Sequence, residues 1–69
     1  MDVGSFGELL AALRKQHRVS QNELATKLDV HRNTISNWER GTYLPETKTL
    51  VMELAKHLHL NEHETRQLL

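Results

Sequence analysis

The chain has 69 residues, enough for one domain built around a single hydrophobic core. It has no cysteine, which excludes disulfides and thiolate metal sites, and no signal-peptide pattern or apolar run long enough to cross a bilayer. Nine Lys and Arg balance nine Asp and Glu, so the net charge of zero provides no general attraction for polyanions. We therefore expect a single cytoplasmic domain over residues 1–69 without a membrane partner, which leaves open that it is the N-terminal part of a longer protein.

The first amphipathic pattern lies near the N-terminus. Its apolar residues follow the i, i+3, i+4, i+7 spacing of a helix with one apolar face and are Phe6, Leu9, Leu10 and Leu13. Ser5 and Glu8 have the spacing of a capping box, in which both side chains accept hydrogen bonds from backbone N–H groups at a helix start. The pattern predicts a helix over residues 6–17 that begins directly after Ser5.

A second capping box, Ser20 with Glu23, predicts a helix that begins near Gln21. Its apolar residues share one face and are Leu24, Ala25 and Leu28. The helix should end at Asp29, because aspartate tolerates the left-handed conformation of a tight turn better than most residues. A third helix follows over residues 32–40, and Gly41 should end it, since glycine adopts the left-handed conformation without steric cost. Residues 20–41 therefore predict two short helices joined by a tight turn.

The third helix has two chemically different faces. At about 100° per residue, Ile35 and Trp38 fall on one side, where we expect them to pack in the core. Because Trp38 aligns with Ile35, core packing is favoured over base stacking for this indole. The opposite side is polar and carries Asn33, Asn37 and Arg40, with Ser36 flanking them.

This polar face has the hydrogen-bonding groups that read DNA bases. An asparagine amide pairs with N6 and N7 of adenine, and an arginine guanidinium pairs with O6 and N7 of guanine. Because asparagine is a poor helix former, two of them in one short helix indicate a role other than helix formation. Arg32 lies nearer the core side, but its length and its place at the helix N-terminus let it reach base edges.

Two further helices are predicted downstream. Pro45 and Glu46 suit the first turn of a helix that ends near His59. Its apolar stripe consists of Leu50, Val51, Leu54, Ala55 and Leu58. Asn61 and Glu64 resemble another start signal, for a short fifth helix. That helix would contain Thr65, Leu68 and Leu69. With no alternating strand pattern, we expect an all-α, compact bundle of about five helices.

Over residues 6–60 the chain resembles the phage-repressor (Cro/cI, XRE) helix-turn-helix family, whose members have a lambda-repressor-like DNA-binding domain. The residues that carry the resemblance are Gln21 with Glu23-Leu24-Ala25, the run from Ile35 to Gly41, Pro45, and the Leu54-Ala55 pair. The family implies a five-helix bundle that binds operator DNA through the second helix of the motif. One departure is Asp29, where relatives commonly have glycine; its charge slightly weakens the local attraction for phosphate.

The resemblance also implies roles for individual positions. Those that would contact DNA bases are Arg32, Asn33, Ser36 and Asn37. Those that would contact DNA phosphates are Gln21, Arg40, Thr42 and Tyr43. Gln21 would also brace the recognition helix, and Tyr43 is equally suited to packing within its loop. Arg14 and Glu39 would form a structural ion pair between the first and third helices.

Charge is unevenly distributed along the chain. Residues 14–40 hold six basic and three acidic side chains, whereas the rest of the chain holds three basic and six acidic ones. The asymmetry fits a basic half that faces DNA. Because the excess is only three charges, an isolated monomer should bind DNA weakly and with strong salt dependence.

The function we expect is sequence-specific binding of double-stranded DNA by a transcriptional regulator, which in relatives usually acts as a homodimer on paired half-sites. A protein-interaction module, antitoxin-like or the adaptor domain of a larger signalling protein, is the alternative on the same fold, since the chain is neutral and shows no effector region. RNA binding is less favoured, because no exposed aromatic platform for stacking unpaired bases is evident. His57, His59 and His63 do not complete a metal site and no catalytic arrangement is identifiable, so we expect no cofactor and no enzymatic activity.

Overall fold

The computed structural model describes residues 3–69, with side chains from Phe6 onward. The order of its helices is α1 (Val3–Gln16), α2 (Gln21–Leu28), α3 (Arg32–Arg40), α4 (Lys48–His57) and α5 (Glu62–Leu68). No strand occurs between residues 3 and 69, and the predicted all-α bundle of five helices is confirmed. Within the same residues, no helix combines the length and apolar character that crossing a bilayer requires.

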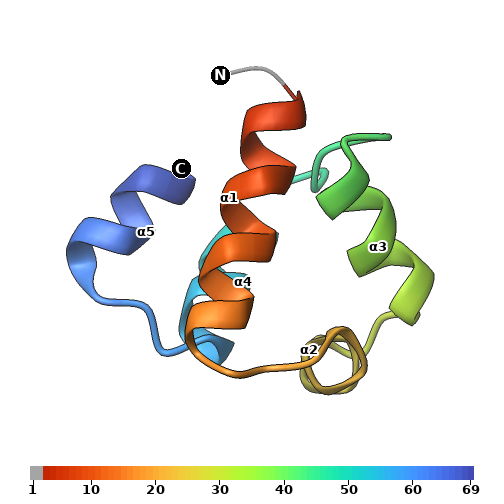
Figure 1. Cartoon of the computed structure of the whole chain (residues 1–69), viewed down its shortest axis with the longest axis horizontal. Helices are drawn as coiled ribbons and strands as arrows, with labels where there is room; N and C mark the ends of the chain where they lie inside the picture. The colour runs from red at the N-terminus through yellow and green to blue at the C-terminus, as the bar shows by residue number, and fades with distance from the viewer. Residues whose placement is uncertain (1–2) are drawn as a thin grey trace.

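In Figure 1, α1 lies at the centre of the view, in front of α4. α3 lies on one side of α1 and α5 on the other, while α2 contacts α3 and α4. Every helix contributes a fully buried side chain to one shared core: Leu10, Leu24, Ile35, Leu54 and Leu68. This common core fixes the position of α3 relative to the other helices.

In the described chain, four helices are followed within two residues by a residue whose backbone is left-handed. These residues are Arg18, Asp29, Gly41 and His59, with φ between 57° and 79°. After each, the next residue donates its N–H to a carbonyl five residues back, as Val30 does to Ala25 at 3.0 Å. The turns at Asp29 and Gly41 were predicted, whereas those at Arg18 and His59 were not.

The predicted start of the first helix was wrong. α1 begins at Val3, so Ser5 lies inside the helix. An N-cap residue needs an extended backbone, so the helical backbone at Ser5 does not fit the N-cap position that the sequence predicted. The end of α1 at Gln16 agrees with the predicted end to within one residue.

The start of the fourth helix also differs from the prediction. Thr47 is the N-cap, and its side-chain oxygen accepts a hydrogen bond from the Leu50 N–H at 3.1 Å. α4 therefore begins at Lys48, and Pro45 precedes it instead of forming its first turn. A helix starting at Pro45 would have had Leu44 as its N-cap, and leucine has no side-chain acceptor.

The fifth helix begins where the sequence predicted. α4 ends at His57, two residues before the predicted end, because His59 is left-handed and cannot continue the helix. Asn61 then caps α5 through a capping box with Glu64, which confirms that start signal. Leu68 of α5 is 1% exposed and anchors the helix in the core.

Glu64 joins α5 to α1. Its Oε1 accepts a hydrogen bond from the Asn61 N–H at 3.1 Å, and both of its oxygens lie 3.3 Å from His17 Nε2. The bond from Asn61 is the largest cause that lowers the pKa of the Glu64 carboxyl; desolvation opposes it, and His17 and His63 lower the pKa further. The carboxylate is therefore favoured in the folded state.

Gly7 lets α1 approach the end of α3 closely. A Cβ added at Gly7 would lie 2.4 Å from the Trp38 backbone oxygen and 2.5 Å from that of Glu39. Real Cβ atoms essentially never come within 3.0 Å of such atoms, and a backbone cannot swing away as a flexible side chain can. The absence of a side chain at Gly7 thus sets the spacing between the two helices.

Candidate nucleic-acid interface

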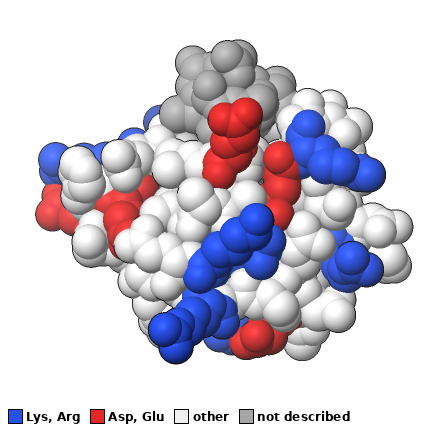
Figure 2. All heavy atoms as spheres, viewed as in Figure 1, with Lys and Arg blue, Asp and Glu red and all other residues white. Residues whose placement is uncertain are grey.

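The surface around α3 is modestly basic. Figure 2 shows Lys and Arg side chains over α3 and the C-terminal end of α1, with acidic side chains among them. Arg14 and Glu39 pair with each other at 2.6 Å, whereas the other seven charged residues between 14 and 40 are exposed. Five of these seven are basic and two are acidic, so the excess of positive charge lies on the surface.

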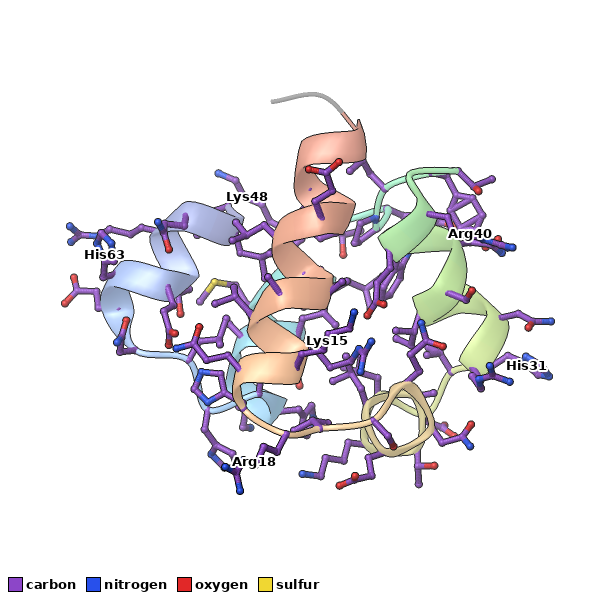
Figure 3. All side chains as sticks on the ribbon, viewed as in Figure 1. Lys15, Arg18, His31, Arg40, Lys48 and His63 are labelled. Carbon is purple, nitrogen blue, oxygen red and sulfur yellow. The ribbon has the colours of Figure 1, made fainter. Side chains whose placement is uncertain are left out.

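α3 presents its polar face to solvent and its apolar face to the core. Ile35 and Trp38 are 0% and 2% exposed, which confirms the predicted core position of Trp38. The residues predicted to contact bases are exposed or partly buried and are Arg32, Asn33, Ser36 and Asn37. Figure 3 shows His31 and Arg40 at the two ends of α3, both projecting away from α1. The outer side of the helix is therefore accessible along its length.

His31 caps the N-terminus of α3. It has an extended backbone, with φ −74° and ψ 145°, and its Nδ1 accepts a hydrogen bond from the Asn33 N–H at 3.1 Å. A ring nitrogen that accepts carries no proton, so the hydrogen of the neutral ring is on Nε2. Sequence reasoning missed this role because histidine is not a preferred N-cap residue; the only signal is its place directly before the helix.

Asn37, Arg40 and Tyr43 form a hydrogen-bonded cluster at the C-terminal end of α3. Asn37 Nδ2 donates to the Tyr43 hydroxyl at 3.1 Å, and Arg40 Nη2 donates to Asn37 Oδ1 at 2.5 Å. Gly41 reverses the chain, and the Thr42 N–H bonds back to the Asn37 carbonyl at 2.9 Å. The turn thus brings one predicted base contact together with two predicted phosphate contacts, and leaves the exposed Thr42 beside them.

Glu39, on the inner side of α3, joins three helices. It accepts hydrogen bonds from Arg14 Nε at 2.6 Å, Arg14 Nη2 at 3.1 Å and Gln21 Nε2 at 2.9 Å. The Arg14 and Glu39 side chains are only 11% and 8% exposed, and Arg14 Nη1 also donates to the Val19 carbonyl at 2.9 Å. We call Arg14, Gln21 and Glu39 the Glu39 hub. It contains the ion pair expected between the first and third helices, and in it Gln21 braces α3.

The N-terminus of α2 has backbone donors next to this hub. Ser20 Oγ accepts a hydrogen bond from the Glu23 N–H at 3.0 Å, so the predicted capping box is confirmed. The N–H groups of Gln21 and Asn22 belong to the first turn, where a helix leaves its donors without helical partners. The Gln21 amide also has a second hydrogen beyond the one that Glu39 accepts. These groups can bind an anion such as a phosphate.

The sequence matches a known protein family and a phage protein. A family profile described as Helix-turn-helix matches residues 10–63. The ImmF control region 10 kDa protein of Bacillus phage phi105 is 40% identical over 50 residues, which make up 72% of this chain. The chain spans only 56% of the length of that relative.

The fold also resembles a solved structure over nearly its whole length. The restriction-modification controller protein C.AhdI from Aeromonas hydrophila superposes with a TM-score of 0.81 at 27% sequence identity. The match covers 97% of this chain and 96% of that chain. Because the family profile spans most of the sequence and the fold agrees, the chain belongs to the helix-turn-helix family, of the phage-repressor type.

Proposed function

We propose that this protein regulates transcription by binding double-stranded DNA sequence-specifically, with α3 in the major groove. The outer face of α3 carries the proposal, because its base-reading candidates line one side of a helix whose other side is fixed in the core. They are Arg32, Asn33, Ser36 and Asn37. The major groove admits an α-helix, and Asn and Arg side chains form paired hydrogen bonds with base edges. Membership of the helix-turn-helix family supports the same function.

Phosphate contacts would fix α3 in the groove. We assign them to Gln21 at the start of α2 and to the exposed Arg40 and Thr42 at the end of α3. Because Gln21 also donates to Glu39, a phosphate held by Gln21 would set the position of the recognition helix directly. Such contacts position a protein on DNA, while base contacts determine the sequence that it prefers.

The regulatory role is proposed from the relatives. The phage protein is named for a control region and the second protein is named a restriction-modification controller. A single copy of this chain offers few phosphate contacts, so we further propose that it acts as a homodimer on paired half-sites. Two-fold symmetry in the protein would then appear as a palindrome in the DNA site.

Selection of duplexes from a random pool tests the proposal. The wild type should enrich one short motif, and a palindromic motif would support the homodimer. Asn33→Ala should cost ~1–3 kcal/mol on the selected duplex and little on random duplex. Arg40→Ala should weaken both and lower the slope of log K against log salt by about one.

Arg66→Ala is the matched control for Arg40→Ala. Arg66 is a highly exposed arginine on α5, which lies across α1 from α3 (Figure 1). Its loss should change neither affinity nor salt slope. Absence of salt-dependent binding by the wild type to any duplex, even at low salt, would contradict DNA binding and favour a protein-interaction module.

A further inference from the structure

The amide of Asn37 has two possible orientations that differ little in shape. Rotation by 180° about the Cβ–Cγ bond exchanges the oxygen and the nitrogen, and so exchanges an acceptor for donors. An asparagine free to rotate therefore presents either pattern to a base. An asparagine held in one orientation presents a single pattern, and that pattern determines which base edge it fits.

Two neighbours contact the Asn37 amide, and one of them sets its orientation. A guanidinium has only donors, so the atom that faces Arg40 Nη2 must be the oxygen Oδ1. Nδ2 then faces the Tyr43 hydroxyl, which accepts its hydrogen bond at 3.1 Å. Arg40 and Tyr43 thus contact opposite ends of the same amide. Arg40 sets its orientation, because a guanidinium can only donate, whereas Tyr43 restrains the amide and takes one N–H of Nδ2.

The amide keeps the groups that an adenine edge requires. Each contact uses one of two available sites, so Nδ2 retains one N–H and Oδ1 retains one lone pair. Adenine offers an acceptor at N7 beside a donor at N6, which matches this pair. Guanine offers acceptors at both N7 and O6. With one N–H taken by Tyr43, Nδ2 cannot donate to both, and Oδ1 would face the remaining acceptor.

We propose that Tyr43 and Arg40 are positioning residues that hold the Asn37 amide with one free N–H and one free lone pair, so that it selects adenine over guanine at one base pair of the DNA site. The proposal rests on the proposed function and deepens it. It assigns the Tyr43 hydroxyl a role in specificity in place of a phosphate contact. Gly41 makes the contact possible, because the reversed chain after α3 returns Tyr43 to a residue six positions earlier.

Tyr43→Phe removes only the hydroxyl. Because the ring is exposed, the substitution should leave the domain folded. Three duplexes serve as probes. The first is the duplex that the wild type selects, and the third has a random sequence. The second is the selected duplex with guanine in place of one adenine, at the position where Asn37→Ala abolishes the preference. Tyr43→Phe should reduce the adenine-over-guanine preference about fivefold, the effect of one hydrogen bond. Binding to random duplex and the salt slope should stay unchanged.

A double-mutant cycle identifies the residue through which Tyr43 acts. With Asn37→Ala already present, Tyr43→Phe should have no further effect on preference. With Asn33→Ala as the matched background, the effect of Tyr43→Phe should persist, because Asn33 has no part in the cluster. Equal losses on selected and random duplex, or an effect that survives Asn37→Ala, would show a phosphate contact and overturn the proposal.

The free protein provides a measurement that does not depend on DNA. Tyr43→Phe should shift the NMR signals of the Asn37 side-chain amide, because one of its N–H groups donates to the Tyr43 hydroxyl, while leaving those of Asn33 unchanged. Unaltered Asn37 signals would overturn the positioning role even if the wild type selects a motif. Failure of the wild type to select any motif would instead remove the proposed function on which this inference rests.

Discussion

Glu39→Gln tests how strongly the Glu39 hub stabilises the fold. The substitution keeps the shape and one acceptor oxygen, but it removes the charge that faces Arg14. Two of the three hydrogen bonds to Glu39 come from that guanidinium, at 2.6 and 3.1 Å, and both side chains are about nine-tenths buried. Breaking a buried ion pair costs ~3–5 kcal/mol; since the amide still accepts one bond, we expect a loss of ~2–3 kcal/mol in the free energy of unfolding.

Urea unfolding followed by circular dichroism measures this loss. Glu62→Gln is the matched control, because Glu62 pairs with Arg66 on α5 where the two side chains are 79% and 75% exposed. An exposed pair of this kind should contribute no more than ~0.5 kcal/mol. Arg14→Met combined with Glu39→Gln should cost less than the sum of the single changes, since each single change leaves the other group without its partner. A loss no larger than that of the control, or strict additivity, would refute the reasoning.

Four further substitutions test residues that stabilise the helix ends and the contacts between helices. Gly7→Ala should cost ~2 kcal/mol or more, because the new methyl group meets two backbone carbonyls; an unchanged melting temperature would contradict this. Arg18→Gly should stabilise by ~0.5–1 kcal/mol, since glycine relieves the left-handed strain, and a lower urea midpoint would count against it. His31→Ala should cost ~1 kcal/mol through loss of the N-cap, and His31→Asp should recover it in the same assay. Glu64→Gln should lower stability at neutral pH. Folding lowers the pKa of Glu64, so the stabilisation by its carboxylate should be complete above the unfolded pKa of about 4.3 and should fade as the pH falls below that value. Urea midpoints measured as a function of pH would show this.

The helix-turn-helix could be predicted from sequence because its signals are local. Ser20 with Glu23 marks the start of α2, and Asp29 and Gly41 mark the ends of α2 and α3. Each of these signals acts within a few residues of chain, so periodicity and capping rules are sufficient. Trp38 was placed correctly for a similar reason, since its spacing from Ile35 puts both side chains on one face.

Features that depend on contacts between distant segments could not be predicted. Gly7 matters because of the carbonyls of α3, more than thirty positions later in the sequence. Ser5 has the residue type and spacing of an N-cap, but only the backbone conformation shows that the helix already includes it. The left-handed turns at Arg18 and His59 lack the glycine that usually marks them. The apolar residues after them, Val19 and Leu60, were the available signal, because such a residue packs back on the helix it follows.

Specificity in this chain must come mainly from geometry, because charge contributes little to affinity. With an excess of only three positive charges between residues 14 and 40, each copy can neutralise few phosphates, and random duplex should compete weakly. Directional bonds then carry most of the preference for one site, and they are effective only if the side chains are held in place. The Glu39 hub orients the whole of α3, while Arg40 and Tyr43 hold the Asn37 amide in place. Loss of the hub should therefore affect folding and all base contacts together, whereas loss of the Tyr43 hydroxyl should affect the choice of one base pair alone.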